Sequence, residues 1–230
     1  MVHVLLLMTT LLVTQMAGLP KGQFPDGWTV RLDGADTQAG PAPAPTTPAP
    51  VTGGIAKAAP DASDISFVVM KPGWHITTGP SAILYQPTQA ASGTYTLKSE
   101  TFLFDPGTRR EAFGVFVGGT HLESDRQAYT YFVIRRTGEF LIRRRSGTST
   151  TDVKPWTSDA AIKKWEDRAA DAHSVRNVLE VKVSPETTTF HVNGAEVARV
   201  PTGQIDTDGI VGLRVNHQLN IHVSSLDVMK

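Results

Sequence analysis

Hydrophobic and polar residues alternate along most of the chain beyond residue 64. Short runs rich in Val, Ile, Thr, Tyr and Phe are separated by turns that contain glycine, which is typical of strands with one face in a core. Asn193-Gly194 lies between two such runs and is a strong hairpin signal, because a type I′ turn requires positive φ at both central residues. Thr137-Gly138 predicts a second hairpin. The pattern indicates an all-β protein.

The predicted strands combine β-branched or aromatic residues with bounding turn residues. They are Ser66–Lys71, Trp74–Thr78, Ala82–Gln86, Gly93–Phe104, Glu111–Gly118, Ala128–Arg136, Glu139–Arg145, Asn177–Val183, Thr187–Val192, Glu196–Val200 and Gly209–Val223. Their number and spacing favour an antiparallel β-sandwich or a barrel. Residues 158–172 depart from the alternation. They carry apolar positions at helical spacing, with Ser158 as a cap, and predict one short helix.

The N-terminal part of the chain divides into segments of different character. The apolar run Val4–Val13 has the length of the hydrophobic region of a secretory signal, so we expect a signal peptide over residues 1–20 and a secreted or periplasmic protein. A buried N-terminal strand or helix is the alternative. Residues 21–35 hold a first strand region. Residues 36–63 are rich in Pro, Ala and Thr and predict a disordered insertion or linker, which leaves residues 64–230 as the sandwich domain.

Composition narrows the classes of function. The 22 basic and 22 acidic side chains balance, so the chain has no overall field that would attract nucleic acid or an anionic membrane. The absence of cysteine excludes disulfides, thiolate metal sites and a cysteine nucleophile. The sequence contains no phosphate-binding loop, no dinucleotide fingerprint after a strand and no Gly-x-Ser-x-Gly motif.

The last strands carry a family resemblance. Val192–Val197, Asp208–Arg214 and Leu219–Val223 resemble the end of concanavalin A-like lectin/glucanase jelly rolls, and the nearest group is the 3-keto-disaccharide hydrolase-like domain of unknown function. Earlier segments that fit the same pattern are Trp74–Pro80, Tyr95–Phe102, Gly114–Gly118 and Tyr129–Phe140. The resemblance implies an antiparallel jelly-roll sandwich, and it is a pattern of strand ends and glycines rather than a catalytic signature.

Related laminarinase-type glycosidases carry a Glu-x-Asp-x-x-Glu strand whose outer carboxylates are the nucleophile and the acid/base. No such spacing occurs in this chain. Glu123-Ser-Asp125 lacks the third carboxylate, and Glu166-Asp167 falls in the predicted helix. A retaining hydrolase needs two carboxyl groups about 5–5.5 Å apart on one rigid surface. Ordinary glycosidase chemistry is therefore not expected.

Tyrosines and arginines crowd the hairpin around Thr137-Gly138. Because successive strand residues point to opposite faces, about half of them share one side. A two-residue turn places on one face Tyr129, Tyr131, Arg135 and Arg144. The other face then carries Arg136, Arg143 and Arg145. A slip of one residue in the register would exchange the cross-strand partners. Such a face suits sugars, through ring stacking and guanidinium hydrogen bonds, whereas the alternative is an ordinary solvated strand face.

Further candidate residues come from the aromatic and histidine positions. Trp74 and Trp156 are candidates for a binding cleft, although tryptophan is often a core residue. Asn216 is a candidate ligand-binding residue, and His75 and His217 are candidate general bases. Each histidine could equally be a hydrogen-bonded structural residue.

The sequence predicts no metal site of its own. Asp206-Thr-Asp208-Gly209 resembles half of a calcium loop, but Val211 and Leu213 stand where further oxygen ligands would be needed. A structural calcium collected from separated loops stays open, and no other cofactor is expected.

Three functions are compatible with these observations. The first is a secreted β-sandwich that recognises a carbohydrate or glycan ligand without ordinary glycosidase activity, with no nucleic-acid partner and no membrane span. The second is a hydrolase or lyase on 3-keto-glycosides, in which a histidine base suffices because the keto group acidifies the neighbouring C–H. The third is a structural or adhesive surface domain tethered by the Pro/Ala/Thr segment. Whether the protein is an enzyme stays open at this point.

Overall fold

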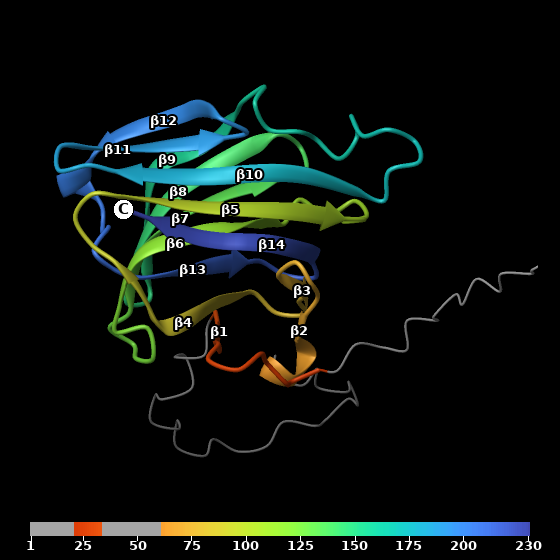
Figure 1. The fold of residues 1–230 in the computed structure, drawn as a ribbon, viewed down its shortest axis with the longest axis horizontal. Helices are drawn as coiled ribbons and strands as arrows, with labels where there is room; N and C mark the ends of the chain where they lie inside the picture. Colours follow the sequence, from red (N-terminus) through yellow and green to blue (C-terminus); the bar gives the residue numbers. More distant parts are fainter. Residues whose placement is uncertain (1–20, 34–60) are drawn as a thin grey trace, which may run out of the picture.

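A computed structural model describes residues 21–33 and 61–230 and shows two seven-stranded antiparallel sheets packed face to face (Figure 1). Sheet A consists, in spatial order, of β1 (Thr29–Leu32), β4 (Ala82–Ala91), β13 (Gly209–Val215), β6 (Ala112–Thr120), β7 (Ala128–Arg135), β8 (Glu139–Ser146) and β9 (Ser149–Ser158). Sheet B consists of β12 (Ala195–Pro201), β11 (Thr187–Val192), β10 (Ser174–Val183), β5 (Tyr95–Phe104), β14 (Asn220–Met229), β3 (Trp74–Thr77) and β2 (Ser66–Val69). The predicted all-β antiparallel sandwich is confirmed.

The core lies between the two sheets and follows from the alternation of the strands. Phe132 of sheet A packs its ring edge against Phe190 of sheet B, with 5.2 Å between ring centroids, and against Phe140 at 6.1 Å. All three rings are fully buried. Burial of each such side chain stabilises the fold by roughly 1.5–3 kcal/mol, so this inter-sheet contact helps to hold the two layers in one arrangement.

The turn at Asn193-Gly194 has the geometry that the sequence predicts. Asn193 has φ 52° and Gly194 has φ 89°, the positive values of a type I′ turn. The side chain of Asn193 also accepts a 2.9 Å hydrogen bond from the backbone N–H of Val178 on β10. This residue therefore closes the hairpin and ties it to the neighbouring strand.

The turn between β7 and β8 is longer than expected. Arg135 is paired with Glu139, so the loop contains the three residues Arg136, Thr137 and Gly138 instead of two. Gly138 adopts φ 82° and donates its N–H to the carbonyl of Arg135 at 3.0 Å. The extra residue shifts the cross-strand partners by one position, as the slip considered above would do.

Residues 158–172 do not form the predicted helix. The part of the chain that the structure describes contains two 3-10 turns, Ala62–Asp64 and Thr202–Gln204, while residues 159–173 run through bends and turns. Ile162 and Trp165 are buried, as their spacing suggested, but the backbone N–H of Trp165 bonds to the carbonyl of Arg136. Contacts with the sandwich replace the internal helical ladder. The strand that was predicted as Gly209–Val223 is likewise divided into β13 and β14, in different sheets.

Some predictions concern the segments outside the described residues. The signal peptide over residues 1–20 and most of the Pro/Ala/Thr-rich segment over residues 36–63 lie there. The first strand region appears as β1, which pairs with β4 at one edge of sheet A. No helix among the described residues is both long enough and apolar enough to cross a bilayer.

Candidate functional site

The outer face of sheet A, which points away from the core, carries a layer of stacked aromatic rings. Tyr85 on β4, Phe116 on β6, and Tyr129 and Tyr131 on β7 all point to this side, and all four are buried by one another and by neighbouring side chains. The ring centroids of Phe116 and Tyr129 lie 5.2 Å apart, and those of Tyr129 and Tyr131 lie 5.8 Å apart. An outer strand face normally alternates to polar residues, so this second apolar layer distinguishes sheet A.

An arginine lies at the centre of this aromatic layer. Arg214 on β13 is 6% exposed and binds both carboxylate oxygens of Asp33, which follows β1. Its Nη1 also donates to the hydroxyl of Tyr129 at 3.3 Å, and its guanidinium lies 5.3 Å from the ring centroid of Tyr131. Arg145 on β8 approaches the same carboxylate at 3.6 Å. Burial alone would raise the pKa of Asp33, but the hydrogen bond and charge of Arg214, together with Arg145, lower it below the ordinary 3.8.

At the β9 edge of the same face, an arginine lies over a tryptophan ring. The guanidinium of Arg135 lies 4.1 Å from the ring centroid of Trp156 on β9, a cation–π geometry. Arg135 also forms an ion pair with Glu139, whose pKa falls to about 2 because of hydrogen bonds from Arg135, Thr137 and Arg110. These contacts hold the indole, which is only partly buried, in a fixed position at the surface.

A further ion pair joins the last two strands of the sheet. Arg143 on β8 is directly opposite Tyr131 and bonds to Asp152 on β9. The Arg143 side chain is 31% exposed. It therefore offers donor groups to a ligand without leaving its carboxylate partner.

A cavity of about 300 Å³ opens at one end of this face. Its walls include Tyr85, Leu122 and Ile210, and its rim includes His121, Glu123 and Arg126. The hydroxyl of Tyr85 is buried and has no hydrogen-bond partner among the described residues. Burial, followed by the nearby charge of Glu123, raises the pKa of Tyr85, so the hydroxyl stays protonated and can donate. A buried donor without a partner is costly, and this one belongs to a residue that lines the cavity.

The structure brings together part of the predicted ligand-binding set. Tyr129, Tyr131 and Arg135 share the outer face of sheet A, as expected. Arg144 does not join them, because the three-residue turn places it opposite Thr130, and it pairs with Asp206 at 2.6 Å. Arg143 and Arg145 occupy the predicted position in its stead, so the face assignment of these three arginines was wrong.

The other predicted residues are spread over the molecule. Trp74 packs toward the core, with its ring centroid 4.9 Å from that of Trp28. His75 lies on the outer face of sheet B in register with His222, and burial lowers its pKa. Trp74 and His75 therefore do not converge with the tyrosines of sheet A.

His217 and Asn216 lie in the loop between β13 and β14. The His217 side chain is 61% exposed, and its Nδ1 lies 2.8 Å from Ser81 Oγ and 3.7 Å from Glu111 Oε2. Both contacts fall on the same ring nitrogen, so the three residues do not form a serine–histidine–acid relay. The carbonyl of Ser81 also accepts a hydrogen bond from the backbone N–H of Asp33 at 2.9 Å, so His217 lies at the Asp33 end of the face, at its rim.

Sequence reasoning missed the centre of the site. Asp33 and Arg214 are 181 positions apart, and Tyr85 lies on a strand that no motif distinguished. The only usable signal was an arginine inside the apolar strand Gly209–Val215, since a charged residue in such a run is rarely buried without a partner.

The three acidic residues among the arginines of this face lack the features of a catalytic pair. Asp33, Glu139 and Asp152 are each bound to an arginine. A general acid in a glycosidase needs a raised pKa, whereas the pKa values of Asp33 and Glu139 are lowered. No group of three or more potential metal ligands occurs among residues 21–33 and 61–230.

Comparisons with known proteins identify the fold. No protein-family model and no curated protein matches the sequence. Among solved structures, carbohydrate binding module CBM66 from Bacillus subtilis is similar with a TM-score of 0.55 at 8% identity, covering 72% of this chain and 92% of the module. The GH16 protein of the Bacteroides ovatus mixed linkage glucan PUL, solved with its G4G4G3G product, gives 0.55 at 8% identity, covering 91% and 98%. A Bacillus subtilis protein of unknown function with a galectin-like fold gives 0.53 at 12% identity, covering 72% and 87%.

At these identities the likeness concerns the fold alone. The narrower resemblance to 3-keto-disaccharide hydrolase-like domains stays a prediction. The chain has the fold of a concanavalin A-like lectin/glucanase β-sandwich.

Proposed function

We propose that this protein binds a carbohydrate on the outer face of sheet A and acts as a recognition module rather than an ordinary glycosidase. The observation that carries the proposal is the aromatic layer of this face with its fixed arginines, together with the cavity that Tyr85 of the same layer lines. Ligand sites combine apolar or aromatic walls with a few convergent polar groups, and this face has both.

Sugar rings present apolar C–H faces and hydroxyl edges, and the site matches each. Trp156 is held in place by Arg135 and is partly exposed, so a sugar ring can stack on it. Arg143 can donate hydrogen bonds to the hydroxyl groups of a sugar, and Asp152 can accept hydrogen bonds from them. The side chains are anchored before the ligand arrives, which reduces the entropy lost on binding.

The likeness to a carbohydrate binding module and to a GH16 protein with a bound product supports the proposal only as an analogy of fold. The absence of ordinary glycosidase activity is supported by the paired acids of the face. The arginine partners of Asp33 and Glu139 lower the pKa of both carboxyl groups, so neither is suited to protonate a leaving group, and Asp152 is bound to Arg143.

A glycan array followed by calorimetry on the best ligand tests the proposal. Trp156→Ala and Arg143→Ala should each weaken binding at least about tenfold, the loss expected for one stacking contact or one charged hydrogen bond. Arg199→Ala is the matched control, because Arg199 forms a similar exposed ion pair with Glu196 on sheet B. Binding that survives both sheet A variants, or that the control weakens equally, would contradict the assignment.

A second candidate function rests on His217. Its exposed imidazole lies beside Glu111 at the rim of the face, where it could take a proton from the carbon next to a keto group. Such chemistry needs no carboxylate pair. Release of product from a 3-keto-glucoside by the wild type, lost in His217→Ala with the fold intact, would support this function. Equal rates in both proteins would exclude His217 as the base.

We also propose that the protein is exported, which is supported by the apolar run Val4–Val13. Expression of the full chain, followed by N-terminal sequencing of the protein recovered outside the cytoplasm, tests this step. Recovery of the uncleaved chain in the cytoplasm alone would contradict it.

A further inference from the structure

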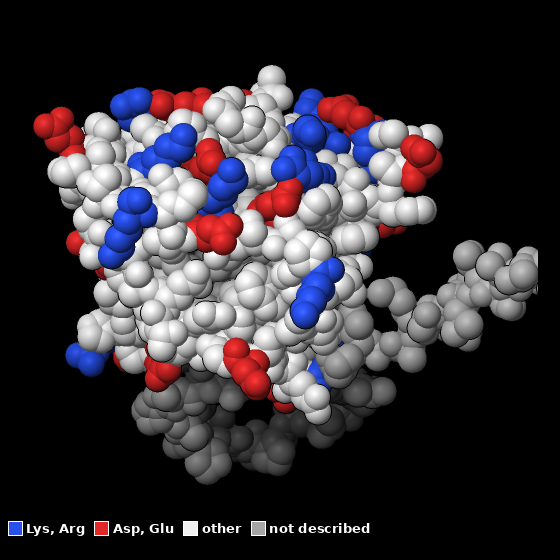
Figure 2. Space-filling model, in the orientation of Figure 1, with Lys and Arg blue, Asp and Glu red and all other residues white. Residues whose placement is uncertain are grey.

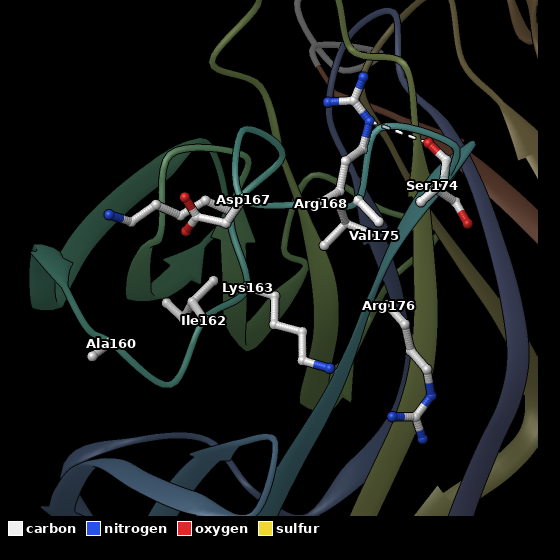
Figure 3. Close-up of a pocket in the computed structure, with 11 residues that line it drawn as sticks. Ala160, Ile162, Lys163, Asp167, Arg168, Ser174, Val175 and Arg176 are labelled. Carbon is white, nitrogen blue, oxygen red and sulfur yellow. Dashed lines mark hydrogen bonds between the residues drawn. The ribbon is translucent and has the colours of Figure 1, made fainter.

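A second cavity, of about 500 Å³, lies between the loop of residues 159–173 and strand β10, outside the aromatic face of sheet A (Figure 3). In Figure 1 this loop extends from the end of the sandwich at the right of the view. The volume falls within the range of roughly 300–1,000 Å³ that is usual for ligand sites. Ile162 and Val175 form buried apolar parts of its lining.

The charged lining of this cavity is mostly basic. Its members are Lys163, Lys164, Arg168, Arg176 and one acid, Asp167. Figure 3 shows Lys163 reaching from the loop toward strand β10 and Arg176, while Arg168 extends to the opposite end of the cavity. The basic groups are therefore spread along the cavity and do not converge on one point.

Three of these cations differ from most arginines of the domain in lacking a carboxylate partner. Arginines elsewhere pair with acids, as Arg135 does with Glu139 and Arg214 with Asp33. Figure 2 shows basic and acidic side chains close together on the face of the molecule that carries sheet B. Arg176 of β10 pairs with Glu100 of β5 in that sheet. Within the described ranges, Lys163, Lys164 and Arg168 form no ion pair. Their charge is left for another partner.

The loop is also held rigidly, although it has no regular secondary structure. Asn177 on β10 is 2% exposed and bonds through its amide to both the N–H and the carbonyl of Lys163, at 2.9 and 3.1 Å. Arg168 lies 3.8 Å from the ring centroid of Trp165 and donates to the carbonyls of Trp165 and Ala172. These bonds fix the backbone of Lys163 and the guanidinium of Arg168 before any ligand binds.

We propose that this cavity binds a segment of an acidic polysaccharide, with carboxylate or sulfate groups on successive sugars. Several separated cations suit a chain that carries repeated charges better than one small anion, and guanidinium and ammonium groups both bind such oxyanions. Nucleic acid fits less well. Binding of single strands usually stacks bases on exposed aromatic rings, and the indole of this loop, Trp165, is buried and covered by Arg168.

Affinity electrophoresis in gels that contain polygalacturonate, dextran sulfate or neutral dextran tests the proposal with the intact protein. The wild type should be retarded by at least one of the two acidic polymers, and retardation should weaken at least about tenfold in Lys163→Ala/Lys164→Ala, which removes two charged contacts. Added salt should reduce it. The preferred polymer distinguishes carboxylate from sulfate. Arg176→Gln is a second variant that should weaken the same interaction.

Lys182→Ala/Lys230→Ala is the charge-matched control, since Lys182 lies on the same strand outside the cavity and Lys230 at the C-terminus. Equal weakening in the control, or no retardation by either acidic polymer, would overturn the proposal. Equal affinity for single-stranded DNA with the same dependence on the lysines would also overturn it. Loss of retardation in Trp156→Ala would place acidic-polymer binding on sheet A instead, so this proposal and the proposed function can fail separately.

Discussion

The ion pair between Arg214 and Asp33 provides a quantitative test of how the candidate face is held together. The Arg214 side chain is 8% exposed and that of Asp33 is 27% exposed. Asp33→Ala leaves the guanidinium buried without its carboxylate partner, while the contacts with the Tyr129 hydroxyl and the Tyr131 ring remain. Removing one partner of a buried pair costs about 3–5 kcal/mol, and the partial exposure of Asp33 favours the lower end, about 3 kcal/mol. For a chain of this size, that loss corresponds to a fall in Tm of roughly 6–12 °C.

Urea unfolding at neutral pH, followed by tryptophan fluorescence and circular dichroism, measures this loss. Arg214→Met removes the charge while keeping much of the volume, and the double variant Asp33→Ala/Arg214→Met removes both charges. Because the main penalty comes from a charge left without a partner, the double variant should be more stable than Asp33→Ala alone. A loss below about 1 kcal/mol in Asp33→Ala, the size of an ordinary surface change, would refute the reasoning. So would a double variant that loses the sum of the two single effects.

The pH dependence gives a second readout of the same pair. The pKa of Asp33 is lowered in the folded protein, against the effect of burial, by the hydrogen bond and charge of Arg214. The ionised carboxylate therefore stabilises the fold above the ordinary pKa of 3.8, and this contribution is lost as the pH falls through the lower folded value. The difference in stability between the wild type and Asp33→Ala should shrink in that acidic window. A difference that stays constant down to pH 2 would show that the charge is not responsible.

Three further predictions concern stability. Gly118→Ala should lower the free energy of unfolding by about 1–3 kcal/mol, because Gly118 has φ 66° and a Cβ there would meet the backbone of Asp206. A loss below about 0.5 kcal/mol in urea unfolding would contradict this. Asn177→Ala should cost about 1–3 kcal/mol and speed proteolysis within residues 159–173, since Lys163 loses both amide bonds; unchanged cleavage would show that the loop is held by other contacts. The ionised Glu139 stabilises the fold above its ordinary pKa of 4.5, and this contribution is lost as the pH falls toward the folded pKa of about 2. Glu139→Gln should lack this contribution, so its stability should change less with pH in that range. Identical acid unfolding curves for the two proteins would disprove the role of this carboxylate.

The comparison of sequence and structure is clearest at two turns. At Asn193-Gly194 the local chemistry decides the result, because few residue pairs other than Asn-Gly adopt two consecutive positive φ values so readily. At Thr137-Gly138 the same kind of signal gave the position of the turn but not its length, since Gly138 serves a three-residue loop as well as a two-residue one. The extra loop residue places Arg143 and Arg145 beside the tyrosines, where a two-residue loop would have placed Arg144.

The segment 158–172 shows how tertiary contacts override a local pattern. The spacing of Ile162 and Trp165 correctly indicated that both are buried, yet helical spacing alone does not require a helix. Bonds from Asn177 and Asn193 to the backbone of this loop satisfy groups that a helix would have satisfied internally. A fifteen-residue helix is marginal without such support in any case.

Local patterns in the sequence were enough to predict an antiparallel all-β fold, because alternation and turn residues are properties of neighbouring positions, and the family resemblance favoured the sandwich over the barrel. The sequence also placed Tyr129, Tyr131 and Arg135 on one strand face, since that follows from the two-residue period. Which residues from distant strands join them depends on how the strands are ordered in the sheet. Asp33 and Arg214 meet because β1 and β13 both pair with β4, one on either side of it. Strand order depends on the packing of the whole chain, and no local pattern encodes it.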